Sequence, residues 1–271
     1  MAVTFVVAPE WQGSGSPRAM RLVDGAEAIR GDLPSAATRV VDIPLEAGDA
    51  QGTGVHRLSS IAVVRDRVAE TLAGVTGPAI TIGGDCGVEL GAIEHASAPG
   101  VAVVWFDAHP DLNSPESSPS GAFGGMVLRT LLGDGPSALV PAVPLDPTRV
   151  VIAGARAIDD GEEEYLAATG IPMLSPDDVS AESIVAAVEA TGATAVYIHV
   201  DLDVLDPAEI EGLAAPLPFG LGAAQLVEAV RALRERFEFA GAGITAFAPA
   251  SMAAAVDDMP TILRLIGALA R

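Results

Sequence analysis

The stretch Val101-Ala-Val-Val-Trp-Phe106 is a continuous apolar run, and it leads directly into Asp107-Ala-His109-Pro-Asp111. A second stretch, Ala195-Val-Tyr-Ile-His-Val200, leads in the same way into Asp201-Leu-Asp203. Continuous apolar runs of this length are typical of strands that are buried on both faces of a parallel sheet. Because ligands bind at the carboxyl ends of such strands, we expect the two acidic clusters to share one site.

Short apolar runs alternate with helical patterns along the chain. Strands are predicted over residues 3–7, 39–43, 79–82, 101–106, 150–153, 173–174, 195–200 and 240–246. Helices are predicted over residues 59–73, 88–96, 124–132, 162–169, 181–191, 222–237 and 259–270. This alternation indicates βαβ units and a parallel sheet that is covered on both faces. We therefore predict a single α/β domain over residues 1–271.

The composition narrows the class of protein and its partners. Hydrophobic residues make up 50% of the 271 residues, which allows a large core, and the formal net charge is −21. A surface this acidic disfavours nucleic acid and anionic membranes and tolerates cationic small molecules. The single cysteine excludes an internal disulfide and fits a cytoplasmic protein. No apolar stretch reaches the ~18 residues that span a bilayer, and the N-terminal run is typical of a buried strand rather than a signal peptide.

The acidic clusters are typical of a metal site. Asp107, His109 and Asp111 alternate, so an extended backbone points them the same way, and the same holds for Asp201 and Asp203. Four carboxylates packed together would repel one another unless two divalent cations lay between them. Oxygen-rich ligands favour Mn²⁺ or Mg²⁺ over structural Zn²⁺. The alternative is that these acids cap helices and turns, but two clusters after two core strands favour metal.

Three motifs resemble those of the arginase/agmatinase (ureohydrolase) family, and the similarity spans nearly the whole chain. They are Gly83-Gly84-Asp85, Asp107-Ala-His109-Pro-Asp111 and Asp201-Leu-Asp203-Val-Leu-Asp206-Pro207. The resemblance implies a three-layer α/β/α sandwich with a central, mostly parallel sheet of about eight strands. It also implies two Mn²⁺ ions per chain. Asp107 and Asp201 would bridge them and hold the hydroxide that attacks a guanidinium carbon, Asp111 would complete one metal site, and His109 with Asp203 would complete the other.

Cys86 departs from the family pattern because it occupies the position of a metal-binding histidine. A thiolate can ligate a metal, which deprotonates it, so we predict that Cys86 is a metal ligand. A site with one metal or with two different metals remains open. Two other interpretations are a small buried hydrophobic residue and a nucleophile paired with a histidine. The sequence shows no third group that would orient such a histidine.

Two further replacements lie where the family carries out its reaction. The family's general acid/base histidine is replaced by Gly124, and the glutamate that receives the substrate's guanidinium is replaced by Ala246. Both new residues are smaller than those they replace. Loss of an acid that pairs with a buried cation costs several kcal/mol of binding for that cation. These positions therefore favour a bulkier and less basic guanidine.

The residues that arginases use to hold the α-amino acid are mostly retained. Ala122 replaces a second asparagine of the family pattern. By resemblance, the carboxylate would be bound by three residues of the loop 113–121 and the amino group by two acids after the strand 150–153. These are Asn113, Ser118 and Ser120, and Asp159 and Glu162. Each of them singly is also consistent with ordinary loop and cap chemistry or with an exposed acidic helix start.

A retained amino-acid end and an altered guanidine end predict hydrolysis of Nω-hydroxy-L-arginine to L-ornithine and hydroxyurea. Within the family, the combination resembles the hydroxyarginine hydrolases of D-cycloserine biosynthesis. One alternative is a conventional arginase or agmatinase in which a water replaces the missing histidine. The other is a catalytically inactive relative that keeps its metals. No tail follows the last predicted helix, so we expect a monomer.

Overall fold

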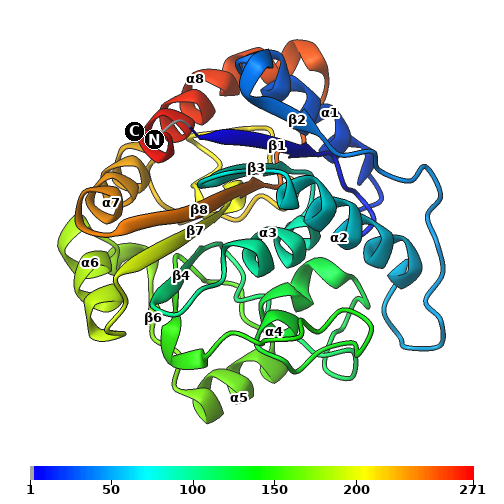
Figure 1. Cartoon of the computed structure of the whole chain (residues 1–271), viewed down its shortest axis with the longest axis horizontal. Helices are drawn as coiled ribbons and strands as arrows, with labels where there is room; N and C mark the ends of the chain where they lie inside the picture. The colour runs from blue at the N-terminus through cyan, green and yellow to red at the C-terminus, as the bar shows by residue number, and fades with distance from the viewer. Residues whose placement is uncertain (1–2) are drawn as a thin grey trace.

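The computed structural model describes residues 3–271, which build one parallel sheet between two layers of helices (Figure 1). The strand order is β2-β1-β3-β8-β7-β4-β5-β6, and all neighbours are parallel. The predicted fold class is confirmed. The strands are β1 (Thr4–Ala8), β2 (Thr38–Val40), β3 (Ala79–Gly83), β4 (Val101–Phe106), β5 (Val150–Ala153), β6 (Met173–Leu174), β7 (Ala195–Asp201) and β8 (Glu238–Thr245).

Each face of the sheet packs against its own group of helices. One face carries α1 (Met20–Gly31), α6 (Ala181–Ala190), α7 (Ala223–Arg236) and α8 (Met252–Leu269). The other carries α2 (Leu58–Ala73), α3 (Glu89–Ala96), α4 (Val127–Leu131) and α5 (Asp160–Thr169). Val104 and Trp105 show why the strands are apolar throughout: they are neighbours on β4, yet they belong to opposite cores.

Helix α1 was not among the predicted helices. Gly25 lies in the middle of this helix, and glycine weakens a helical pattern by about 1 kcal/mol relative to alanine. The structure explains the glycine, because a Cβ at this position would overlap the carbonyl oxygen of Phe247. Close packing of α1 against the loop after β8 therefore requires the residue that disfavours the helix.

Other boundaries also differ from the predictions. Helix α8 begins at Met252, seven residues before the predicted start, because the Ser251 hydroxyl accepts a hydrogen bond from the Ala254 amide and caps the first turn. The predicted helix 124–132 is a 3₁₀ turn (Phe123–Met126) followed by the short α4. The predicted strand 39–43 is limited to β2.

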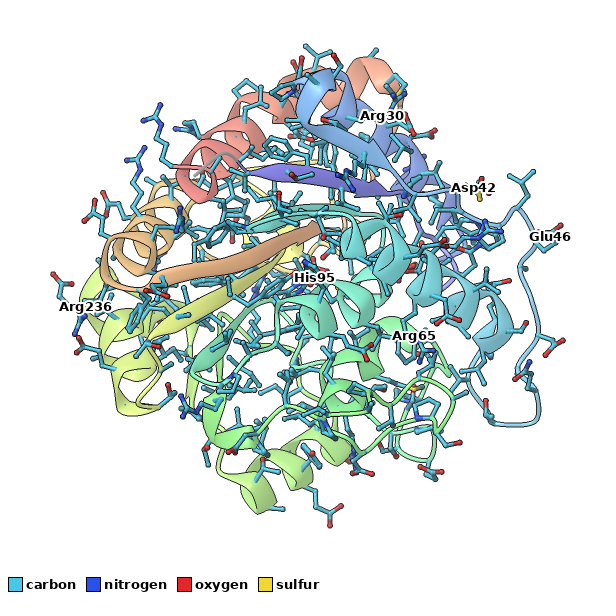
Figure 2. The ribbon with its side chains drawn as sticks, viewed as in Figure 1. Arg30, Asp42, Glu46, Arg65, His95 and Arg236 are labelled. Atoms are coloured by element: carbon cyan, nitrogen blue, oxygen red, sulfur yellow. The ribbon has the colours of Figure 1, made fainter. Side chains whose placement is uncertain are left out.

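Several charged side chains lie at the periphery of the molecule, where Figure 2 shows Asp42, Glu46 and Arg236 pointing outward. Arg236 contacts Glu189 at 2.6 Å, and Arg67 contacts Asp42 at 3.0 Å. Exposed ion pairs of this kind contribute about 0–1 kcal/mol each, so the fold depends on its two apolar cores. Within residues 3–271, the helices are too short or too polar to cross a membrane.

Candidate active site

A cavity of about 710 Å³ lies beyond the carboxyl ends of β3, β4, β7 and β8. Its size suits a small molecule, because ligand pockets usually measure about 300–1,000 Å³. The lining includes every residue that the sequence singled out for a site: Cys86, Asp107, His109, Asp111, Asn113, Ser118, Ser120, Gly124, Asp159, Glu162, Asp201, Asp203 and Ala246. Residues from five separate parts of the chain thus meet in one cavity.

The metal end of the cavity is the part lined by the candidate ligands Cys86, Asp107, His109, Asp111, Asp201 and Asp203. Within it, His109 contacts both Asp107 and Asp203. The Asp107 Oδ1 atom accepts a hydrogen bond of 2.7 Å from the His109 amide. The His109 Nδ1 atom lies 3.4 Å from Asp107 Oδ1 and 3.2 Å from Asp203 Oδ2. Burial opposes the charged imidazole, but these two carboxylates outweigh it and raise the pKa of His109 to about 12. Burial raises the pKa of Asp107, but the contacts with His109 and His199 outweigh it and lower that pKa.

Asp111 and Asp201 are buried acids with few compensating donors. The Asp111 Oδ2 atom is buried and has no hydrogen-bond partner among the described residues, and the backbone of Asp111 is held at φ +54°. Burial, followed by the charge of Asp107, raises the pKa of Asp111; burial and the charge of Asp203 do the same for Asp201. The Asp201 carboxylate also accepts a hydrogen bond of 2.8 Å from the Asp203 amide. Asp201 therefore caps the 3₁₀ turn Leu202–Val204 and also lines the cavity.

Cys86 lies at the start of a 3₁₀ turn (Cys86–Val88) that Asp85 holds in place. The Asp85 carboxylate accepts the amides of Gly13 and Gly87, each at 2.9 Å. Gly84 is required before it, because a Cβ there would overlap the carbonyl oxygen of Glu10. The Cys86 Sγ atom lies 3.1 Å from Asp201 Oδ2, and burial followed by the charge of Asp201 raises the pKa of the thiol.

His199 is a functional candidate that the sequence analysis did not select. It is fully buried on β7, and its Nε2 atom lies 3.8 Å from the Cys86 sulfur. Glu89 contacts His199 Nδ1 at 3.0 Å, so a group that orients a histidine near Cys86 does exist, contrary to our expectation. The sequence did contain a signal for His199. This residue precedes Asp201 by two positions on one strand, which places both side chains on the same face.

The donor atoms suit divalent cations. Within residues 3–271, two groups bring one ligand atom each into mutual proximity: Cys86, Asp107 and His199, and Asp107, His109 and Asp203. Buried carboxylates without sufficient counter-charge are costly, and cations would remove that cost. The unpartnered oxygen of Asp111, which lines the same cavity, is a further oxygen donor that could bind a cation. The residues present therefore fit the two metals implied by the sequence.

Asn113 and Asp159 contact each other at the other end of the cavity. The Asn113 amide nitrogen donates to Asp159 Oδ2 at 2.8 Å, and the Ser117 hydroxyl donates to Asn113 Oδ1 at 2.8 Å. Glu162 uses both carboxylate oxygens, since they accept the amides of Leu112 and Asp159 at 2.9 Å each. Glu162 is buried, so the alternative of an exposed helix start is wrong for this residue.

Ser118 and Ser120 line the same cavity. The Ser118 oxygen accepts the Gly121 amide at 3.1 Å, and the Ser120 oxygen accepts the Ala122 amide at 3.2 Å. Neither hydroxyl donates a hydrogen bond to another described residue. Because a serine hydroxyl has one donor hydrogen, both are available to a carboxylate in the cavity.

Gly124 and Ala246, the two positions with small residues, both line the cavity. A Cβ on Gly124 would meet only the Gly13 carbonyl oxygen, at an ordinary contact distance of 3.5 Å. Ala246 has a left-handed backbone, with φ +67°, and its amide donates to the Gly84 carbonyl at 2.7 Å. The described residues around Gly124 therefore leave room for a side chain.

The last acid of the third motif lies outside the cavity. Asp206 is at the surface, and its carboxylate accepts the amides of Phe219 and Gly220 at 2.7 and 3.2 Å. Those bonds, with the Ala208 amide, lower the pKa of Asp206. Asp206 therefore organises a loop, which makes it a natural control for Asp201 and Asp203.

Comparison with known proteins gives a family for this arrangement. A model described as the arginase family matches residues 14–259. The chain belongs to the arginase family. It is 34% identical to the arginase of Entamoeba histolytica over 191 residues, which is 66% of this chain, and 33% identical to that of Bacillus subtilis over 153 residues, or 52% of this chain. These alignments span only 64% and 52% of the relatives' own lengths.

Solved structures of the arginase family share the fold over almost the whole chain. The Entamoeba histolytica arginase, solved in complex with L-ornithine, has a TM-score of 0.87 at 24% identity. The superposition covers 98% of this chain and 97% of the Entamoeba chain. The proclavaminate amidino hydrolase of Streptomyces clavuligerus has a TM-score of 0.72 at 21% identity, with 100% and 93% of the two chains covered. At this identity, the similarity establishes the fold alone.

Proposed function

We propose that this chain hydrolyses Nω-hydroxy-L-arginine to L-ornithine and hydroxyurea with two Mn²⁺ ions. Water forms a bond to the guanidine carbon, the bond from that carbon to the side-chain nitrogen breaks, and a proton passes to the leaving amine. One observation carries the proposal. A single cavity combines a buried cluster of metal donors, free hydrogen-bond donors for a carboxylate, and two wall positions without functional side chains, Gly124 and Ala246.

The acidic cluster would hold the cations. Six residues of the cavity would serve as ligands: Cys86, Asp107, His109, Asp111, Asp201 and Asp203. Bound there, the cations would supply Lewis-acid activation of the attacking water. Asp107 and Asp201 would be the shared, bridging ligands, and the hydrogen bonds from the amides of His109 and Asp203 keep these two carboxylates in place.

The loop 113–121 and the start of α5 would hold the α-amino acid. The hydroxyls of Ser118 and Ser120 and the Asn113 amide would donate to the carboxylate, and Asp159 would receive the ammonium group. Glu162 would act through its buried bonds to Leu112 and Asp159, which align the loop with the helix. This set distinguishes an α-amino acid from agmatine, which has no carboxylate.

The altered wall would select the guanidine. The oxygen of an N-hydroxyguanidine lowers its basicity, so the group needs no counter-acid at Ala246. Gly124 leaves space for the additional atom, since even a Cβ there would make only ordinary contact with the surrounding residues. The substrate hydroxyl would then lie where a histidine side chain is missing and would help to relay the proton to the leaving amine.

A substrate comparison tests the proposal. Manganese-loaded protein is incubated with Nω-hydroxy-L-arginine, L-arginine and agmatine, and ornithine or putrescine release is measured with metal content in the same samples. We expect turnover of hydroxyarginine with kcat/KM at least about 10²-fold above arginine, the discrimination that one buried charge contact supplies. Faster release from arginine would overturn the proposal in favour of an arginase. Two metals per chain without any turnover would indicate an inactive relative.

We also propose that residues 1–271 act as one domain, as a monomer and in the cytoplasm. The sheet joins strands from both ends of the described chain, with β1 and β8 on either side of β3. Light scattering at micromolar concentration should give a mass near 27.4 kDa. A mass of two or more chains would contradict the monomer.

A further inference from the structure

The proposed reaction gives His199 no role, yet this residue lies next to Cys86 and Asp107, two of the proposed metal ligands. Its Nε2 atom is 3.8 Å from the Cys86 sulfur and 3.9 Å from Asp107 Oδ2. The second distance is well beyond an N–H···O hydrogen bond, which is at most about 3.2 Å long. Both distances approach the separation of two ligands on one tetrahedral cation, which is about 3.5 Å for sulfur and imidazole on zinc.

Glu89 fixes which ring nitrogen of His199 faces the cluster. Glu89 contacts Nδ1 at 3.0 Å and also accepts the Tyr197 hydroxyl, so this carboxylate acts as an acceptor. Nδ1 is therefore the ring nitrogen that donates to Glu89, and Nε2 is the nitrogen that faces Cys86 and Asp107. A carboxylate on the far nitrogen is the arrangement that metal-binding histidines almost always show. Trp105 stacks on the ring at 3.6 Å between centroids and fixes its plane.

We propose that His199 is a metal ligand through Nε2, at the cation that Cys86 and Asp107 also bind. This inference rests on the proposed function only in requiring a two-metal centre. The two oxygens of Asp107 support it, because Oδ2 faces His199 while Oδ1 faces His109. Each oxygen thus lies near one of the two histidines, an arrangement that suits a carboxylate shared between two cations. His199 restores to the Cys86 site the imidazole that replacement by cysteine removed.

The two metal sites then differ in chemistry. Cys86, His199 and Asp107 offer one thiolate, one imidazole and one carboxylate, which suits a borderline cation such as Zn²⁺. His109, Asp107 and Asp203 offer one imidazole and two carboxylates, which suits Mn²⁺ better. The Cys86 site should therefore also accept thiophilic divalent cations, which makes zinc and cadmium suitable probes beside the Mn²⁺ of the proposed reaction.

Cadmium-113 tests the assignment directly, because cadmium binds thiolates and has a nuclear spin. The full chain, labelled with ¹⁵N in its four histidines, is titrated with ¹¹³Cd²⁺ and examined by ¹H–¹⁵N correlation spectra. We expect the Nε2 of His199 to be split by ¹¹³Cd, in addition to any splitting of the His109 ring at the other site, and to lose the splitting with spin-zero cadmium. The Nδ1 atom should show a bound proton. A variant His199→Gln assigns the signal, and the measurement requires no turnover.

Variants give a second measurement, with a matched control. His199→Gln should lose the tighter-binding zinc ion in a chelator competition, and Glu89→Gln should weaken it by about 10–100-fold. His95→Gln, on the exposed surface of α3 (Figure 2), should change neither metal site.

Three results would overturn the inference. An unsplit His199 signal beside cadmium whose own shift shows a thiolate ligand would do so. So would a His199 ring protonated on both nitrogens in the metal-bound protein, because that ring can only donate a hydrogen bond to sulfur. Failure of the wild type to bind any cadmium would remove the metal centre itself. Hydroxyarginine turnover, measured separately, distinguishes that failure from failure of the proposed reaction.

Discussion

At one end of the cavity, Asp107 and Asp201 follow directly on central strands, and backbone amides hold them in place. At the other end, Asn113, Ser118 and Ser120 belong to an irregular loop whose shape depends on hydrogen bonds between its own side chains and amides. The first set is fixed by the register of parallel strands, and the second by a loop that can change without disturbing the sheet.

This difference separates the reaction class from the choice of substrate. A change in the register of β4 or β7 would move Asp107 or Asp201 together with the acids that follow it, so this end is difficult to alter piece by piece. Loop residues and single wall positions such as Gly124 and Ala246 can be exchanged singly. The comparison therefore predicts that variants at the metal end abolish activity, while variants at the wall and the loop redirect or weaken it.

The largest effect is expected from Asp107→Asn, which removes the carboxylate that faces both donor groups. Metal content should fall by at least one ion per chain, and kcat should fall by about 10³-fold or more, because activation of the water depends on the cations. Asp206→Asn is the matched control. Asp206 belongs to the third motif but holds a surface loop, so its replacement should change neither the metal content nor kcat. Full metal occupancy in the Asp107 variant would remove Asp107 from the bridging position.

Cys86→Ser should affect one metal and spare the other. A hydroxyl is a weaker and harder ligand than a thiolate, so the affinity for zinc or cadmium at this site should fall by about 10²-fold while one ion is retained. Metal analysis after dialysis, with cobalt absorption as a report of the sulfur ligand, would measure it. Unchanged metal content and spectrum would make Cys86 a core residue.

Gly124→His together with Ala246→Glu should shift preference towards L-arginine. The glutamate restores a partner for a charged guanidinium, and the open space beside Gly124 admits a side chain. We expect the ratio of kcat/KM for arginine over hydroxyarginine to rise by about 10²-fold. Each single variant serves as the control for the other. A double variant with an unchanged ratio would show that the wall does not select the guanidine.

Asp159→Ala tests the amino-acid end. Loss of a carboxylate that receives an ammonium group should raise KM by about 10–100-fold, the cost of one charge-assisted hydrogen bond, with a smaller change in kcat. Asp160→Ala, the exposed acid next along α5, is the control. If both variants keep the KM of the wild type, Asp159 does not contact the substrate.

The sequence alone was sufficient for the central strands and for the meeting of their terminal acids. The runs that include Trp105 and Val200 are apolar on both faces, and the carboxyl ends of neighbouring parallel strands meet at one edge of the sheet. Helix α1 was missed because Gly25 is required by packing against Phe247, a contact far away in the chain. Local propensity carries no information about such a contact.

The partners of the site residues were also beyond the sequence. Glu162 has the same local pattern as an exposed first turn, and only the fold places Leu112 against it. The Glu89–His199 pair joins residues 110 positions apart. Periodicity places each of these residues on one face of its own element, but which faces come together is decided by the tertiary packing of α3 and β7.

The smallest effect is expected outside the ligand set, at Glu10. Both of its carboxylate oxygens are buried without a hydrogen-bond partner among the described residues, and burial followed by the charge of Asp85 raises its pKa well above 4.5. The folded state therefore holds a proton that the unfolded state releases. The contribution of Glu10 to stability is complete below pH 4.5 and is lost as the pH rises through the folded pKa. Over that interval, the free energy of unfolding should fall by at most about 1.4 kcal/mol per pH unit.

Glu10→Gln removes this titration and keeps the shape of the side chain. The free energy of unfolding of this variant, measured with urea at several pH values, should therefore increase relative to that of the wild type as the pH rises from 5 to 8. Glu27→Gln, a partly exposed acid on α1, is the control and should follow the wild type. Parallel profiles for Glu10→Gln and the wild type would mean that Glu10 is ionised in the folded protein, and the metal end would then contain a further buried negative charge that its cations must balance.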